Sequence, residues 1–224
     1  MPLAFLPEWV EPVVRYMAEE GLKQTILMAA WAVAASALIG VTLGTLLTIN
    51  FLPAKALIRL YIEVWRGLPI IVTIFLIYFT GPEAGIKLSA FQSGAVALSL
   101  WGSAQVAEAT RGAVQSIPRE QHQAAAALGF GWVGRHAFVI LPQALRRLMP
   151  PMVSLLVNVI QNTTLASIIG VAEVLQTGQR SVERLQLSIG DPHAFEIYAG
   201  VLVAFFVISF PLTRLAAYLE RRLV

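Results

Sequence analysis

The sequence contains a run of 25 residues, from Thr25 to Ile49, without a single charged side chain. A helix needs roughly 20 mainly apolar residues to cross about 30 Å of hydrocarbon. Four further windows meet this requirement, at residues 57–80, 91–110, 151–170 and 196–219. Backbone groups within a bilayer must satisfy their own hydrogen bonds, which favours helices. The sequence therefore predicts an all-α integral membrane protein with five transmembrane helices.

The composition agrees with a membrane protein. Only 13% of the 224 residues are charged, whereas soluble domains carry about 25%. Residues 1–22 hold four glutamates and no apolar core, unlike a signal peptide. We expect an extracytoplasmic segment at residues 1–22 and one transmembrane domain at residues 23–222. With no cysteine in the chain, disulfides and thiolate metal sites are excluded.

The basic residues indicate the orientation. Segments 50–56, 111–150 and the C-terminus share one side of a five-span chain and carry Lys55, Arg111, Arg119, Arg135, Arg146, Arg147, Arg221 and Arg222. The N-terminus and segments 81–90 and 171–195, on the other side, are mainly acidic. The positive-inside rule places the basic side in the cytoplasm. We therefore expect the N-terminus outside and the C-terminus inside, and no nucleic-acid partner.

The longest polar interruption covers residues 111–147. Its Ala-rich run predicts a short helix with Ser116 as N-cap, Pro118 in the first turn and Gly129 at the end. Pro142 is expected to break the chain before the next span. Two interpretations stay open: a docking surface for a soluble partner, or an amphipathic helix lying on lipid headgroups.

Two pairs of opposite charges lie three residues apart near the ends of predicted spans. Glu63 precedes Arg66, and Glu108 precedes Arg111. Residues at this spacing share a helix face. Because charge at membrane depth is costly, we expect structural ion pairs, with an anchoring role and a functional role equally supported.

Small residues and one proline predict local features of the first two spans. Ser36, Gly40 and Gly44 recur at four-residue spacing, which allows another helix to approach closely. A packing seam within the chain is favoured over a dimer face. Pro69 lacks an amide hydrogen and predicts a kink in the second span.

The fourth predicted span carries polar side chains at Asn158, Gln161, Asn162, Thr163, Thr164 and Ser167. Polar groups at this depth face a cavity or another helix. One interpretation is a solute pathway, to which Gln105 of the third span would add an amide. The other is hydrogen bonding between helices. Amides both donate and accept hydrogen bonds, which suits a zwitterionic solute.

Motifs for catalysis are absent from the sequence. It contains neither the phosphate-binding G-x-x-x-x-G-K-S/T pattern nor G-x-S-x-G, and its three histidines show no ligand-like spacing. We therefore expect no catalytic residue, no metal site, and no cofactor bound by this chain.

The segment Q-A-A-A-A-L-G at residues 123–129, followed by Ile140-Leu141-Pro142, resembles the E-A-A loop of ABC importer permeases. The stretches Y-I-E-V-W-R-G-L-P at 61–69, A-E-A-T-R-G at 107–112 and T-L-A-S-I-I-G-V-A-E at 164–173 are similar to the polar amino-acid subfamily. The resemblance covers residues 20–222.

The resemblance implies a type I ABC importer permease in a bacterial inner membrane, with five spans. Its partners would be a second permease, identical or related, two ATP-binding cassette subunits that use ATP and Mg, and an extracytoplasmic solute-binding protein, all within membrane lipid. The loop around 119–142 would dock into the ATPase. The residues carried over for this coupling are Gln123, Ala124, Ala125, Gly129, Leu141 and Pro142.

Three departures from the family pattern concern these same regions. Gln123 stands where the motif has an acid, Gln105 where many relatives have Tyr, and Gln161-Asn162 where many have Lys-Asp. We predict the permease subunit of an importer for amino acids or similar small polar solutes. A self-contained secondary transporter or channel is the alternative, although the five spans show no convincing internal repeat.

Overall fold

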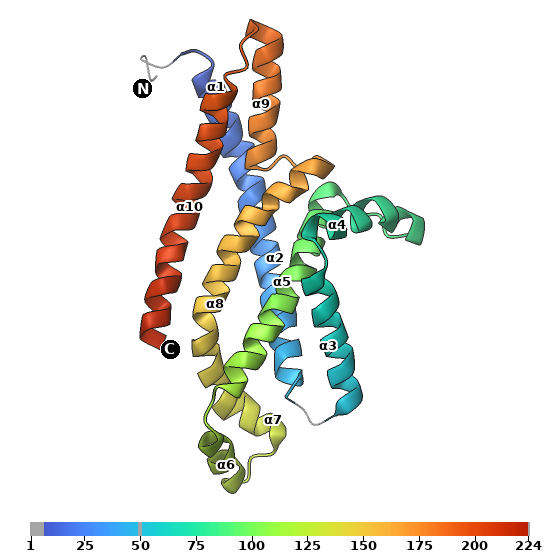
Figure 1. Ribbon diagram of the computed structural model, residues 1–224, viewed down its shortest axis with the longest axis vertical. Coiled ribbons are helices and arrows are strands. Elements are labelled where there is room, and N and C mark those ends of the chain that lie inside the picture. The colour runs from blue at the N-terminus through green and yellow to red at the C-terminus, as the bar shows by residue number, and fades with distance from the viewer. Residues whose placement is uncertain (1–6, 49–50, 224) are drawn as a thin grey trace. The chain divides into compact units, whose positions relative to one another are not determined.

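A computed structural model describes residues 7–48 and 51–223, and every regular element in these residues is a helix (Figure 1). The α-helices are α1 (Val10–Tyr16), α2 (Lys23–Leu46), α3 (Leu52–Gly67), α4 (Ile70–Phe75), α5 (Ala90–Gln115), α6 (Arg119–Ala127), α7 (Trp132–Arg135), α8 (Leu141–Asn162), α9 (Val174–Ile189) and α10 (Ala194–Leu223). Three π-helical turns are η1 (Met17–Leu22), η2 (Leu76–Thr80) and η4 (His136–Ile140), and two 3-10 helices are η3 (Gly81–Ala84) and η5 (Thr163–Ile169).

Three helical stretches are long and apolar enough to cross a membrane: Val10–Leu46, Trp132–Ile169 and Ala194–Leu223. A fourth results if α3 and the helices from Ile70 to Ala84 form one broken span. Helix α5 contains the expected third span and has 26 residues, but it is less apolar than this group. The predicted all-helical membrane fold is confirmed, and the number of five spans remains a prediction.

The prolines act in two different ways. Helix α3 ends at Gly67 and α4 begins at Ile70, with Leu68 extended at ψ 136°. A residue before proline avoids the helical conformation, so the predicted disturbance at Pro69 is a full break. The predicted break at Pro142 is wrong. The helical stretch Trp132–Ile169 continues through Pro142 without a break. The π-helical turn η4 lies directly before Pro142, and such a turn changes the backbone hydrogen-bond pattern at the place where the amide hydrogen of Pro142 is missing.

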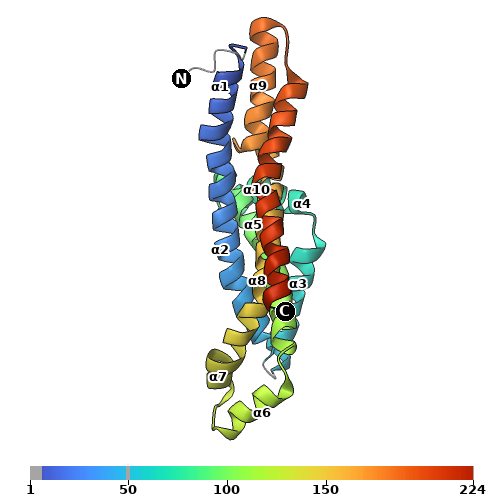
Figure 2. The same ribbon diagram turned by 90° about the vertical axis from the view of Figure 1, so that its left-hand side faces the viewer.

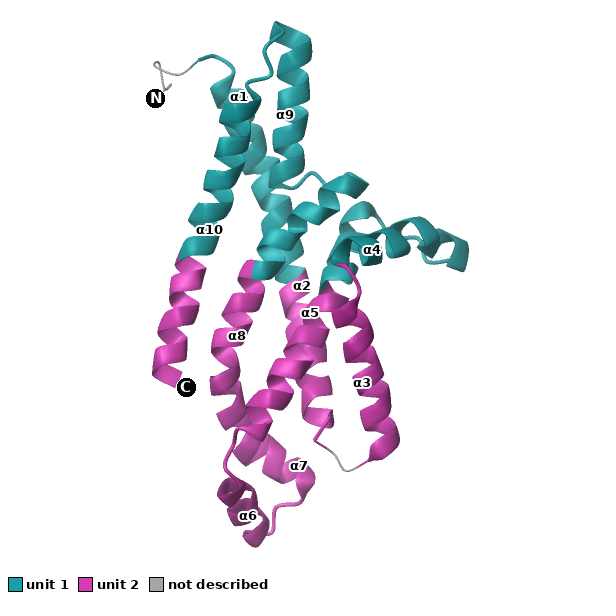
Figure 3. Cartoon of the chain, viewed as in Figure 1, with its two compact units in different colours: residues 1–31, 70–98, 158–210 teal, residues 32–69, 99–157, 211–224 magenta. Residues whose placement is uncertain are grey.

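The described chain divides into two compact units (Figure 3). Unit 1 comprises residues up to 31, 70–98 and 158–210, and unit 2 comprises residues 32–69, 99–157 and the residues from 211 onward. Several long helices, α8 among them, contribute to both units.

In unit 1, helix α9 runs beside α1 and η1 (Figures 1 and 2). Val13 of α1, Leu185 of α9 and Ile197 of α10 form an apolar core beside this contact. At its inner end the backbone N–H of Val174 donates to Thr25 Oγ1 at 3.3 Å. Gly21 lies so close that a methyl group on it would be 3.0 Å from Val174 Cα. The absence of a side chain at Gly21 is therefore what lets the two helices meet.

In unit 2, α2 packs against α5 through the small residues that the sequence singled out. A methyl group on Gly40 would lie 2.7 Å from the carbonyl oxygen of Ser103. Ser36 Oγ donates to the carbonyl oxygen of Ser99 at 3.3 Å. The predicted seam within the chain is thereby confirmed.

Candidate functional site

The segment between α5 and α8 is built as predicted at one end of its helix and differently at the other. Gly129 follows α6 with φ +83°, a left-handed conformation that glycine adopts without strain. The predicted N-cap, Ser116, is wrong, since α6 is preceded by Pro118. Ser116 Oγ instead donates to the carbonyl oxygen of Ala113 at 2.7 Å, within the end of α5.

Helix α6 exposes most of its surface. Ala125 is buried at 2% exposure, His122 is half-buried, and Gln123 and Ala124 are exposed. Beyond the helix, three large apolar side chains protrude, with exposures of 78% for Leu128, 72% for Val133 and 73% for Phe138. Exposed apolar side chains beside a short polar helix are typical of a surface that another protein covers.

Contacts with α5 and α8 hold this segment. Arg147 Nη1 donates to the carbonyl oxygen of Ser116 at 2.6 Å, and Gln143 Nε2 donates to Gln121 Oε1 at 3.4 Å. A small apolar core lies beneath, made of Ala113, Val114, Ile117, Ile140 and Ala144. Leu141 is half-buried and Pro142 exposed at the start of α8. The exposed face of α6 therefore has a fixed support.

The imidazole of His122 contacts the ring of His136 in η4, with 6.2 Å between the ring centroids. Burial lowers the pKa of His122, and the nearby charges of Arg135 and His136 lower it further. His122 is consequently neutral over more of the physiological pH range than a free histidine.

The second candidate region lies where α8 ends and η5 begins. It contains two kinds of polar side chain, hydroxyls and amides. The hydroxyls of Thr163, Thr164 and Ser167 each donate at 2.7 Å to a backbone carbonyl three residues earlier. Thr163 is also completely buried. These hydroxyls are satisfied by their own helix, so their polarity by itself requires neither a cavity nor a neighbouring helix.

The amides behave differently. Asn158 and Gln161 are exposed and Asn162 is half-buried. No hydrogen bond of these three amides occurs among the residues that the structure describes. Gln105 lies half-buried on the part of α5 that belongs to unit 2. The three unit 1 amides thus share a short stretch of helix, and a common pathway with Gln105 remains a prediction.

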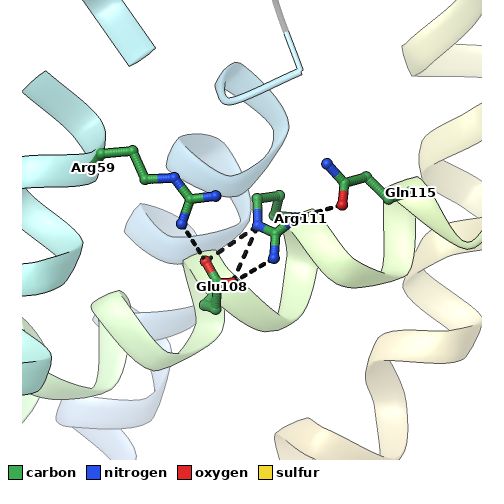
Figure 4. Close-up of polar contacts among 4 residues, drawn as sticks. All are labelled: Arg59, Glu108, Arg111 and Gln115. Atoms are coloured by element: carbon green, nitrogen blue, oxygen red, sulfur yellow. Dashed lines mark hydrogen bonds and ion pairs between the residues drawn. The ribbon is translucent and has the colours of Figure 1, made fainter. Parts of the chain in front are cut away.

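A third group of predicted residues forms an ion network in unit 2 (Figure 4). Glu108 pairs with Arg111 at 2.5 Å, as its spacing indicates, and also accepts from Arg59 Nη1 of α3 at 3.0 Å. Arg111 in turn donates to Gln115. One carboxylate therefore joins α3 to α5.

The predicted pair between Glu63 and Arg66 does not form within the described part of the chain. Both side chains are exposed on α3, where an ion pair stabilises little. The charge of Arg66 acts instead on Glu108.

Sequence analysis did not identify two residues that form structural contacts. Arg59 lies 49 positions before Glu108, and no local spacing joins them. Glu173 is fully buried, and its carboxylate accepts the N–H groups of Leu175 at 2.9 Å and Gln176 at 2.7 Å as the N-cap of α9. An acidic residue just before a helical pattern was the signal that could have identified it.

The family described as "Binding-protein-dependent transport system inner membrane component" matches residues 36–224, most of the chain. The chain belongs to this family. The permease is 34% identical over 206 residues to the "Glutamine transport system permease protein GlnP" of Escherichia coli (strain K12), which covers 91% of both chains. It is 30% identical over 204 residues to the "Probable glutamine ABC transporter permease protein GlnM" of Bacillus subtilis (strain 168), which covers 91% of this chain and 92% of that protein.

Solved structures agree with this assignment. The permease resembles a chain of an "amino acid ABC transporter with histidines", with a TM-score of 0.80, 28% identity, and coverage of 95% and 96% of the two chains. A chain of the "MetNI methionine ABC transporter" shares the fold, with a TM-score of 0.77 at 20% identity. The predicted importer-permease family and fold are confirmed, and the relatives favour this interpretation over a self-contained transporter or channel.

Proposed function

We propose that this permease forms the membrane pathway of an importer for amino acids or similar small polar solutes, and that partner ATP-binding cassette subunits supply the energy. The observation that carries the proposal is the set of amides at Asn158, Gln161 and Asn162 that lack described partners on a candidate span. An unsatisfied amide within a membrane costs several kcal/mol. Water and a passing solute would satisfy these amides.

The chemistry of the amides suits this substrate class. An amide offers a carbonyl acceptor to an ammonium group and an N–H donor to a carboxylate. It does so without a full charge that would hold either end of a zwitterion tightly. The names of the relatives, two glutamine permeases and a solved amino acid transporter, support the same class of solute.

Helix α6 would couple ATP hydrolysis in the partner subunits to transport. In this proposal the exposed face around Gln123, Ala124 and Gly129 docks into an ATPase subunit, and Ala125 faces the permease. Gln123 contributes a neutral contact at the rim. An extracytoplasmic solute-binding protein and a second permease, identical or related, complete the complex. The charge distribution supports a cytoplasmic position for α6 and the C-terminus and an extracytoplasmic N-terminus.

Gly129→Asp tests the coupling role. Its side chain would strain a backbone with φ +83° and would place a charge at the proposed contact. We expect normal membrane abundance together with loss of solute uptake and of solute-stimulated ATP hydrolysis.

Gly85→Asp is the matched control. Gly85 also has a left-handed backbone, with φ +81°, and open space around it, but it lies outside the proposed coupling loop. Full activity of Gly129→Asp at equal abundance, or equal loss in both variants, would contradict a coupling role for α6.

A further inference from the structure

One histidine attaches the segment that carries α6 to the cytoplasmic end of α2. His136 is 5% exposed and is the first residue of the π-helical turn η4. Its Nε2 atom lies 3.0 Å from Oγ1 of Thr48, which lies two residues after the end of α2 at Leu46. Among the residues that the structure describes, this is the one hydrogen bond that joins residues 111–147 to α2 or to the two residues after it. Turns of the π type recur at functional positions in helices.

The rings around His136 connect this hydrogen bond to α6. The indole of Trp132 stacks on the imidazole with 4.1 Å between ring centroids. The imidazole of His122, from α6, makes a T-shaped contact with that of His136, with 6.2 Å between the ring centroids. A continuous series of contacts therefore leads from α6 through His122 and His136 to Thr48.

The three hydrogen bonds around His136 can form together in only one protonation state of its imidazole. Thr48 Oγ1 has one hydrogen and donates it to the carbonyl oxygen of Thr45 at 2.7 Å. His136 Nε2 must then donate to Thr48, while Nδ1, 2.9 Å from the carbonyl oxygen of Trp132, must donate there. A neutral imidazole carries only one N–H group. All three bonds therefore coexist only when His136 is protonated.

The surroundings oppose this charge. The hydrogen bond to the carbonyl of Trp132 favours the charged form, but the positive charge of Arg135 in α7 opposes it. The ring of His122 in α6 lies beside the imidazole, and no carboxylate of the described residues acts on it. Burial also disfavours a charged imidazole. The hydrogen bonds thus favour the protonated imidazole, whereas burial and the nearby positive charge favour the neutral one. The strength of the attachment therefore depends on pH.

We propose that His136 is a positioning residue that holds the coupling segment on the cytoplasmic end of α2, most firmly when its imidazole is protonated. The inference rests on the proposed coupling role of α6. The hydrogen bond between His136 and Thr48 can nevertheless be tested independently of that coupling role.

The test uses the assembled complex with Cys-free ATPase subunits. A nitroxide on Glu120→Cys, an exposed position of α6 in a chain without cysteine, reports the mobility of the helix. In the otherwise unchanged permease we expect mobility to fall as the pH falls from about 8 to 6, the range in which histidine titrates. Thr48→Val keeps the side-chain shape but loses the hydroxyl. We expect high mobility at every pH and a roughly tenfold loss of stimulated ATP hydrolysis, the equivalent of one charge-assisted hydrogen bond.

The controls separate the possible origins of the effect. Thr48→Ser keeps the hydroxyl and should behave as the unchanged chain, while His136→Leu should behave as Thr48→Val. Thr48→Val removes no titratable group, so a pH response that arises from His122 would persist in it. Such persistence, or unchanged mobility in Thr48→Val, would overturn the proposal. If the ATPase subunits fail to co-purify, the proposed function fails, whereas the mobility of the label still decides whether the attachment exists.

Discussion

Gly44 of α2 lies directly against the backbone of Ala107 in α5. A methyl group on Gly44 would overlap the Ala107 carbonyl oxygen and would lie 2.6 Å from Thr110 Cβ. The carbonyl belongs to a helix that continues in both directions, so it has little freedom to move aside. The separation of α2 and α5 in unit 2 is therefore determined by the absence of a side chain at Gly44.

The first prediction follows from this contact. Gly44→Ala should lower the unfolding free energy of the permease by about 1–3 kcal/mol, the usual cost of overpacking. Gly112→Ala is the matched control, since a methyl group there meets nothing within 4 Å and alanine favours a helix. Thermal unfolding in detergent should show a lower midpoint for Gly44→Ala and an equal or higher one for Gly112→Ala. Equal midpoints would contradict the contact.

A second prediction concerns the carboxylate shared by two arginines. Glu108→Gln leaves Arg59 and Arg111 without their counter-ion. Breaking a fully buried pair costs about 3–5 kcal/mol, and we expect less here, because 24% of the Glu108 side chain is exposed. The abundance of the complex should fall. Glu63→Gln, which removes an exposed carboxylate without a described ion pair, should leave it unchanged. Intact assembly with an altered solute preference in Glu108→Gln would instead place Glu108 in the pathway.

The third prediction is a pH dependence that arises from Glu173. Burial raises the pKa of this carboxyl, and the hydrogen bonds from Leu175 and Gln176 oppose the rise only in part. The folded state therefore binds a proton more tightly than the unfolded state. Stability from this group is present below the ordinary glutamate pKa and is lost as the pH rises through the raised value. Glu173→Gln should flatten the dependence of the unfolding midpoint on pH above about pH 4. A slope equal to that of the unchanged chain would contradict this assignment.

The fourth prediction addresses the solute pathway. Gln161→Ala and Asn162→Ala should leave a folded complex with a changed apparent affinity or solute selectivity, because these amides lack described partners. Thr163→Val is the control: its hydroxyl donates to Ile160 within the helix, so uptake should change only in proportion to abundance. Uptake that follows abundance in all three variants would favour packing between helices over a pathway.

A cysteine scan of residues 158–167 checks the same region independently. The chain has no cysteine of its own, so each introduced thiol is the only one in the permease. We expect positions 158 and 161 to react with a water-soluble reagent and position 163 to stay protected. Complete protection of the segment in every nucleotide state would exclude an aqueous pathway along it.

The sequence by itself determined the features that depend on neighbouring residues. Apolar windows identified an all-helical membrane protein, and Gly129 was correctly placed at the end of α6 because a left-handed helix end favours glycine. The spacing of Ser36, Gly40 and Gly44 predicted close packing for a similar reason, since it places small side chains on one helix face. Glu108 and Arg111 were paired because they lie three positions apart on one helix.

Only the tertiary structure decided which distant groups meet. Arg59 reaches Glu108, and Thr48 reaches His136, because packing brings separate helices together, and no spacing in the chain encodes either contact. The same holds for polar groups that the sequence treated alike. The hydroxyl of Thr163 turns back to its own helix, whereas the amide of Gln161 remains exposed. Residue type gives a side chain its capacity to form hydrogen bonds, and the packing around it determines whether that capacity is already satisfied.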